Sequence, residues 1–259
     1  MRHIVLVLST FLFSILGISQ ESISITYTGN MGVHIIHEQS SVLIDGLHTK
    51  YGDDYLFPSK DLVHKINYEL KPDAILFTHH HGDHFSSQLS KNYLELNRKA
   101  VLFGAHQITK NFTDHRERIF TITTKDYIKQ TTKINDFSVS GVKINHAGKR
   151  HVSVENVGYI VNFNGKKVLH VGDTNWLEEI NLFNQLRLVD ESIDIAIIPY
   201  WMLLHKNTVE LLKKNINPKH VVATHISPKI PPNELVELKR KYPKIYFLTT
   251  LDEQIQIPL

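Results

Sequence analysis

The strongest constraint on this chain is a group of metal-binding side chains directly after an apolar segment. Residues Ala74–Phe77 predict a buried strand, and Thr78–His84 follows with four histidines and one aspartate. A neutral imidazole and a carboxylate each offer a lone pair to a metal ion. Because alternate residues of an extended segment point to the same side, His79 and His81 can reach one ion. The sequence therefore predicts a metal site at the end of a buried strand.

Asp83 and His84 lie where the chain must turn, and we expect them to bind a second ion beside the first. His80 points away from its neighbours along the strand, so we predict that it is not a ligand. The competing interpretation is a surface histidine cluster that binds metal adventitiously. Such a patch requires neither a preceding strand nor an aspartate at this spacing, so we favour a built metal site.

The spacing H-x-H-x-D-H over His79–His84 resembles the signature of the metallo-β-lactamase superfamily, whose members are mostly hydrolases with two metals. The resemblance covers nearly the whole chain after residue 22. It implies an α/β fold, an αββα sandwich of two mixed β-sheets flanked by helices. Hydrophobic periodicity alone indicates only a mixed α/β chain.

Three later segments contain the remaining ligands that the resemblance implies. His146 ends an alternating strand and is favoured as the third histidine of the first metal, with His151 as the alternative. Asp173 would bridge the two metals, although Asp173 or Thr174 is also a suitable N-cap for the helix that follows. His225 ends an apolar strand with the same Thr-His pair as the first motif and would be a ligand of the second metal, although a strand-end histidine is often structural.

The predicted site has one metal held by three histidines and a second held by one aspartate and two histidines, with an aspartate between them: His79, His81 and His146, then Asp83, His84 and His225, then Asp173. These nitrogen and oxygen ligands suit two Zn²⁺ ions, with iron or manganese as alternatives. Two such ions lower the pKa of a bridging water, which then attacks as hydroxide. Asp83 is expected to serve as general base and acid.

We therefore predict a hydrolase of an ester, lactone, amide or phosphodiester, similar to the lactonase and phospholipase D-like branch. Alternatives on the same fold are a mononuclear-iron oxidoreductase and an RNA phosphodiesterase. The net charge is only +3 and no basic block occurs, so we expect a small-molecule substrate and no nucleic acid. The chain has no cysteine, which excludes disulfides and thiolate ligands. The oligomeric state is open.

Three other places have two interpretations each. Asp45 ends an early strand and either orients a ligand histidine from behind, as the resemblance implies, or caps a turn. His170 lies inside a predicted strand and is expected to be either a core imidazole with its hydrogen bonds satisfied or an imidazole that supports a metal ligand from behind. The stretch Pro199–His205 is either a wall of the substrate pocket or, slightly favoured, part of the core.

The N-terminus predicts a secretory signal peptide at residues 1–19. Arg2 precedes an apolar run from Ile4 to Leu16, and small residues follow before Gln20. The run is too short for a comfortable membrane span, and the alternatives are a buried N-terminal segment or a retained anchor. We expect an exported protein, periplasmic or secreted, with a single domain over residues 20–259 and no stable membrane span after cleavage.

Local patterns predict several elements. The pair Asn164 and Gly165 between two alternating apolar runs predicts a β-hairpin with a type I′ turn. Helices are expected at Ser86–Asn97 and Asn175–Leu186. Residues Ile245–Leu248 are predicted as the last strand of the chain.

Overall fold

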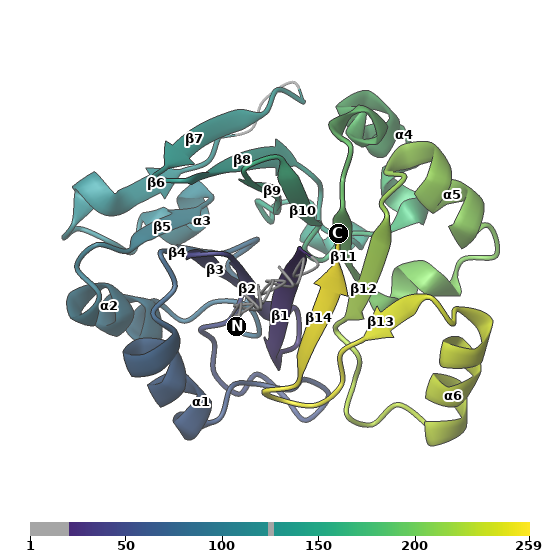
Figure 1. Ribbon diagram of the computed structural model, residues 1–259, viewed down its shortest axis with the longest axis horizontal. Coiled ribbons are helices and arrows are strands. Elements are labelled where there is room, and N and C mark those ends of the chain that lie inside the picture. The colour runs from purple at the N-terminus through teal and green to yellow at the C-terminus, as the bar shows by residue number, and fades with distance from the viewer. Residues whose placement is uncertain (1–20, 124–126) are drawn as a thin grey trace, which may run out of the picture.

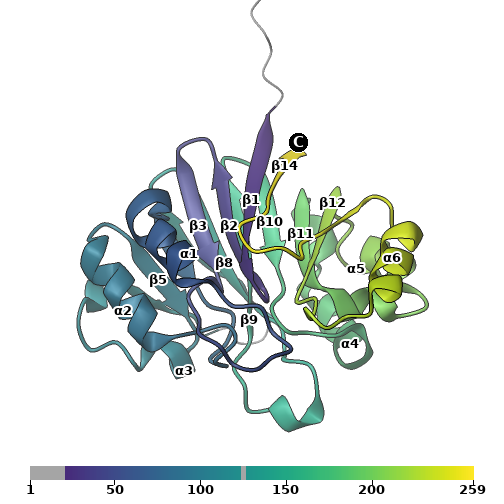
Figure 2. The same ribbon diagram turned by 90° about the horizontal axis from the view of Figure 1, so that it is seen from below.

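Two β-sheets pack face to face in the computed structural model, which describes residues 21–123 and 127–259 (Figure 1). Helices cover the outer face of each sheet, so that the layers follow the order α-β-β-α (Figure 2). This confirms the predicted αββα sandwich. The predicted signal peptide, residues 1–19, lies outside the described residues.

The first sheet has seven strands in the order β14-β1-β2-β3-β4-β5-β6. Pairing is antiparallel from β14 to β3 and parallel from β3 to β6. Its strands are β1 (Ser22–Gly29), β2 (Gly32–His37), β3 (Ser40–Ile44), β4 (Ala74–Leu76), β5 (Val101–Gly104), β6 (Ile119–Thr121) and β14 (Gln254–Pro258).

The second sheet also has seven strands, in the order β13-β12-β11-β10-β9-β8-β7. It repeats the pattern of the first, with antiparallel pairing from β7 to β10 and parallel pairing from β10 to β13. Its strands are β7 (Gln130–Ile134), β8 (Phe137–Lys143), β9 (Val157–Phe163), β10 (Lys166–His170), β11 (Ile195–Pro199), β12 (His220–Thr224) and β13 (Ile245–Phe247).

The helices divide between the two outer faces (Figures 1 and 2). The first sheet carries α1 (Lys60–Lys65), α2 (Ser87–Leu96) and α3 (His106–Thr109), and the second carries α4 (Trp176–Leu186), α5 (Thr208–Asn215) and α6 (Pro232–Lys241). Among the described residues, no helix has the length and apolar character needed to cross a membrane.

The apolar core is divided by the sheets into three parts. The central part lies between the sheets and draws buried residues from both, among them Ile25, Val33, Val161 and Ile197. Two further clusters lie under the helices, one on each outer face. Each fully buried Val or Ile side chain contributes about 1.5–3 kcal/mol. The sheets are therefore buried on both faces over most of their area, which makes the strand ends a rigid platform.

The local predictions agree with the structure except at the C-terminal end. Asn164 and Gly165 both have positive φ, 50° and 96°, as a type I′ turn between β9 and β10 requires. The prediction that Ile245–Leu248 is the last strand is wrong, because β14 follows and pairs with β1 of the other sheet. The chain crosses between the sheets at this point, and local patterning does not reveal such a crossing.

The strand directions bring the candidate ligands to one edge. Strands β8 and β10 are both antiparallel to β9, so they end on the same side, and β12 runs parallel to β10 through β11. The two sheets are joined there by hydrogen bonds. Val157 N donates to Thr78 O (2.8 Å), and the Tyr159 hydroxyl donates to Phe77 O (2.9 Å). The loops after β4, β8, β10 and β12 therefore meet at this edge.

Candidate metal centre

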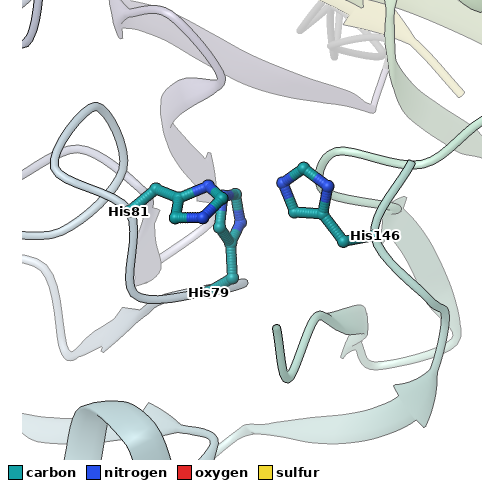
Figure 3. A group of neighbouring side chains, drawn as sticks. All are labelled: His79, His81 and His146. Carbon is teal, nitrogen blue, oxygen red and sulfur yellow. The ribbon is translucent and has the colours of Figure 1, made fainter. Parts of the chain in front are cut away.

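Three histidines from two distant segments form the first cluster. One ring nitrogen of each of His79, His81 and His146 lies within 4.8 Å of the others (Figure 3). His79 Nε2 and His81 Nδ1 are 3.1 Å apart. His79 and His81 come from the loop after β4, and His146 comes from the loop after β8.

Hydrogen bonds determine which nitrogens of this cluster keep a lone pair. The Thr78 hydroxyl donates to Asp45 Oδ2 (2.6 Å), so its oxygen accepts from His79 Nδ1 (3.1 Å). His146 Nδ1 donates to the Ala147 carbonyl (2.8 Å). His79 Nε2 and His146 Nε2 are thus left as acceptors that face the cluster, as metal ligands must be.

His151 lies beside this cluster without joining it. Its ring centroid is 4.4 Å from that of His146 and 5.0 Å from that of His81. Its Nε2 accepts a hydrogen bond from Arg150 Nε (2.8 Å). The structure therefore brings the favoured His146, and not the alternative His151, into the three-histidine group.

Two carboxylates and two histidines form the second cluster, which contains Asp83, His84, Asp173 and His225. Asp173 Oδ2 lies 3.3 Å from His84 Nε2 and 3.3 Å from His225 Nε2. The same oxygen is 3.9 Å from His146 Nε2 of the first cluster. Asp173 thus lies between the two clusters, where a bridging carboxylate belongs.

The N-cap interpretation of Asp173 or Thr174 is wrong. Asn175 is the N-cap of α4, because its Oδ1 accepts from Leu177 N (3.3 Å). Gly172 brings Asp173 close to the first loop, since it has φ of 64° and a Cβ on it would lie 2.9 Å from Thr78 Cβ. Its lack of a side chain lets the end of β10 approach the metal motif.

Asp45 is fully buried behind both clusters. Its Oδ1 accepts from Thr78 N (2.7 Å), and its Oδ2 accepts from the Thr78 hydroxyl and from His84 Nδ1 (2.9 Å). Asp45 therefore orients His84 of the second cluster directly and His79 of the first cluster through Thr78. The sequence suggested one such contact, whereas the structure has two.

The imidazoles of the first cluster are neutral. Burial lowers the pKa of His79 well below its usual value, and burial also lowers the pKa of His81 to about 4. Burial lowers the pKa of His146 as well, although nearby Asp173 opposes this shift. Neutral imidazole is the form that binds a metal.

The second cluster is an ion-pair network. Burial works against a charge on His84, but Asp173 and Asp45 outweigh it and raise the pKa of His84 well above its usual value. Burial likewise works against a charge on Asp173, but His225 and His84 outweigh it and hold the pKa of Asp173 well below its usual value. Without a metal, the charge on His84 is stabilised by the carboxylates of Asp173 and Asp45 on either side of its ring.

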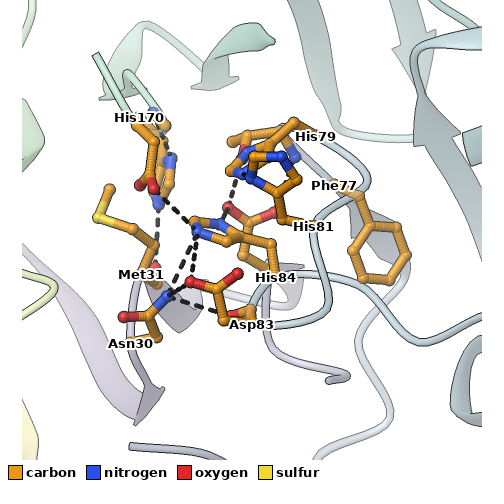
Figure 4. A network of polar contacts seen from close by, with 12 residues as sticks. Asn30, Met31, Phe77, His79, His81, Asp83, His84 and His170 are labelled. Atoms are coloured by element: carbon orange, nitrogen blue, oxygen red, sulfur yellow. Dashed lines mark hydrogen bonds and ion pairs between the residues drawn. The ribbon is translucent and has the colours of Figure 1, made fainter. Parts of the chain in front are cut away.

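Asn30 is a site residue that the sequence reasoning missed. Its Nδ2 donates to Asp83 Oδ2 (3.0 Å) and also lies 3.2 Å from the Asp83 carbonyl (Figure 4). Its own carbonyl accepts from His225 N (2.8 Å). Asn30 has φ of 52°, a conformation that asparagine tolerates better than most residues. The pair Gly29 and Asn30 at the end of β1 was the feature of the sequence that could have pointed to this residue.

The remaining candidates lie outside the clusters. His80 is exposed. His170 is buried, and its Nε2 donates to Met31 O (3.0 Å) while its Nδ1 accepts from Gly172 N (3.2 Å). As predicted, both of its ring nitrogens are satisfied within the core.

A cavity of about 410 Å³ opens onto both clusters. Trp201 lines it and donates from Nε1 to Thr174 O (2.7 Å), whereas Met202 and Leu203 are fully buried in the core. Both interpretations of Pro199–His205 therefore hold for different residues. Tyr51 and Tyr55 also line this cavity and were not recognised from sequence.

The donor set fits divalent cations. His146 Nε2, His225 Nε2 and Asp173 Oδ1 are buried polar atoms that lack a hydrogen-bond partner within the described parts of the chain. Unsatisfied buried polar atoms are costly, and these three, which belong to the two clusters, are the kinds of atom that bind divalent cations.

Sequence comparison identifies the family. Residues 24–225 match the family described as beta-lactamase superfamily domain. The chain belongs to the metallo-β-lactamase superfamily. A UPF0173 metal-dependent hydrolase of Thermococcus onnurineus is 28% identical over 170 residues, covering 61% of this chain and 68% of the relative. Another, of Natranaerobius thermophilus, is 27% identical over 197 residues, covering 71% and 81%. This metallo-β-lactamase superfamily member is thus a metal-dependent hydrolase.

A solved structure agrees with this assignment at the level of the fold. The structure of Igni18, a metallo hydrolase from Ignicoccus hospitalis, matches with a TM-score of 0.62 at 20% identity. The match covers 92% of this chain and 99% of that chain. The superfamily fold therefore extends over most of the described residues.

Proposed function

We propose that the protein is an exported dinuclear zinc hydrolase that cleaves a small ester, lactone, amide or phosphodiester. The observation that carries the proposal is the position of Asp173 between a three-histidine cluster and a mixed Asp/His cluster. The proposed ligands are His79, His81 and His146 for one ion and Asp83, His84 and His225 for the other, with Asp173 shared. These nitrogen and oxygen donors suit Zn²⁺.

Two divalent ions, when bound, supply Lewis-acid polarisation and an activated water. The chain itself supplies the proton transfers. Asp83 lines the cavity, is only 4% exposed, and has one oxygen held by Asn30, so its carboxylate is oriented before substrate arrives. We infer that Asp83 accepts a proton from the attacking water and returns it to the leaving group.

Export follows from the signal-peptide pattern of residues 1–19, and it belongs to the proposal. The proposal also includes a single domain over residues 20–259 and a small-molecule substrate. It includes no interaction with nucleic acid and no stable membrane span. Expression in a bacterial host followed by fractionation and N-terminal sequencing tests export. A mature N-terminus near Gln20 in the periplasm or medium supports it, and an intact cytoplasmic chain contradicts it.

The central test combines metal content with activity. Protein purified without a His tag is expected to contain about two zinc ions per chain by mass spectrometry and to cleave members of an ester, lactone, amide and phosphodiester panel. Asp173→Asn should lose about one ion, and Asp83→Asn should lose activity by about 10²–10⁴-fold. Asp136→Asn, at an exposed position, is the matched control. A protein without bound metal, or full activity of Asp83→Asn, contradicts the proposal.

A further inference from the structure

The wall of the cavity differs between the two metal clusters. On the side of the second cluster it is aromatic, because the rings of Tyr55 and Trp201 meet the His225 ring at centroid distances of 5.5 and 4.6 Å. Tyr51 extends this wall, with its ring 5.7 Å from that of Tyr55. The rings approach one another edge to face, so flat surfaces remain along the wall.

The metal loop itself makes room for this wall. A Cβ on Gly82 would lie 2.9 Å from Cδ2 of the Tyr51 ring, so any larger residue would displace the tyrosine. Tyr51 is nevertheless 58% exposed. A large aromatic side chain that packs on the metal loop and stays open to solvent is suited to contact a ligand.

On the side of the first cluster the wall is cationic. Arg150 and His151 line the cavity there, in the loop between β8 and β9 that projects beyond the sheets (Figure 2). Arg150 uses Nε to donate to His151 Nε2. In the described parts of the chain Arg150 makes no ion pair with a carboxylate, and its hydrogen bond to His151 uses Nε, which leaves its terminal nitrogens as charged donors.

The acids of the cavity do not neutralise this cation. Of the described residues that line it, only Asp83 and Asp173 are acidic, and both belong to the second cluster. Two bound divalent ions would more than compensate these two carboxylates. Arg150 therefore keeps its positive charge at one end of the cavity, and the aromatic surface lies at the other.

We propose that the substrate carries an anionic group, which pairs with Arg150 beside the first cluster, and an apolar ring, which packs against Tyr55 and Trp201 beside the second. The inference rests on the proposed hydrolase function and adds its substrate class. A guanidinium with free terminal donors binds a carboxylate or phosphoryl oxygen pair. The scissile bond then lies between the two ends, across the two clusters.

The test measures binding of phenylphosphonate and methylphosphonate to the zinc-loaded protein by calorimetry. Both carry the same anionic group, and their P–C bonds resist hydrolysis. Phenylphosphonate should bind about tenfold more tightly because its ring is buried. Arg150→Gln should weaken both ligands by about tenfold and leave their ratio unchanged. Tyr55→Ala should instead reduce the preference for the phenyl compound and leave methylphosphonate binding unchanged.

Lys149→Gln is the matched control, because it removes an exposed positive charge from the same loop without altering the cavity wall. It should change both affinities by less than about twofold. The zinc content of each variant shows that the site is intact. The proposal is overturned if Lys149→Gln and Arg150→Gln weaken phosphonate binding equally, or if Arg150→Gln leaves both affinities unchanged. It is also overturned if the preference for phenylphosphonate survives Tyr55→Ala.

Failure of the hydrolase proposal has a different signature. The phosphonates bind without turnover, so the pattern of affinities stands or falls independently of catalysis. A protein that shows this pattern and cleaves no ester, lactone, amide or phosphodiester has the inferred ligand class but not the proposed activity. A protein that hydrolyses neutral substrates and ignores the phosphonates keeps the activity and loses the ligand class.

Discussion

The two clusters share one cavity but differ in what holds them together. The first consists of three neutral imidazoles, with His79 Nε2 and His81 Nδ1 facing each other at 3.1 Å. The second contains two carboxylates and a histidine, His84, that Asp173 and Asp45 keep protonated in the metal-free protein. The second cluster is therefore held by its own ion pairs, whereas the first contains no carboxylate of its own.

This difference predicts that the number of protons released on metal binding differs between the two clusters. A metal at the first cluster displaces no proton near neutral pH, because the imidazoles are already neutral. A metal at the second cluster must displace the proton on His84 Nε2. Five predictions test how the two clusters differ.

The largest effect concerns which histidine completes the first cluster. His146→Ala should weaken zinc binding there on the order of a hundredfold, since one of three ligands is lost. His151→Ala, in the same loop, is the matched control and should change the affinity by less than about threefold. Competition with a chelating dye measures both. The reverse ranking would make His151 the ligand.

The next effect tests the coupling of the clusters through Asp45. Asp45→Asn should weaken zinc binding at both clusters by about 10–100-fold, because the amide cannot accept from both Thr78 and His84 as the carboxylate does. Asparagine suits the φ of 50° at this position, so the backbone is kept. A loss confined to the second cluster would show that Thr78 does not transmit the effect to His79.

The third effect is a pH dependence that separates the clusters. In His146→Ala protein only the second cluster is complete, and its zinc affinity should rise about tenfold per pH unit until the raised pKa of His84 is passed. In His225→Ala protein the first cluster should show a nearly constant affinity above about pH 6, since the pKa of His81 is about 4. Dye competition at several pH values measures this, and parallel profiles would contradict it.

The metal-free protein should show the opposite trend with pH. The pKa of His84 is raised in the folded state, so its contribution to the free energy of unfolding is fully present below the unfolded value of 6.5. That contribution is lost as pH rises through the folded pKa. Urea unfolding of the apo protein across this range checks the sign.

The smallest effect concerns Asn30. Asn30→Ala removes the donor to Asp83 Oδ2 and should lower kcat about tenfold while zinc content stays near that of the wild type. Asn97→Ala is the control, because it removes an amide that donates to the backbone carbonyls of Asn67 and Tyr93, outside the site. Equal losses in both variants would indicate a general effect on stability.

The features that could be predicted from sequence depend on short stretches of chain. The hairpin around Asn164 and Gly165 and the helix at Ser87–Leu96 follow from turn chemistry, capping and periodicity. The strand β14 escaped prediction because its five residues carry a weak pattern and pair with β1, at the other end of the chain. Its existence depends on that partner.

The candidate site also combines features that a short stretch of sequence determines with features that depend on the tertiary structure. The sequence by itself determined that the His79 and His81 side chains lie on the same side of the chain, because alternation along an extended segment is a local property. Only the tertiary structure placed His146, and not His151, in the three-histidine group, and only it placed Asn30 on Asp83, 53 residues away. Loop paths and contacts of this kind depend on how the two sheets pack, and side-chain patterning along one strand carries no information about that packing.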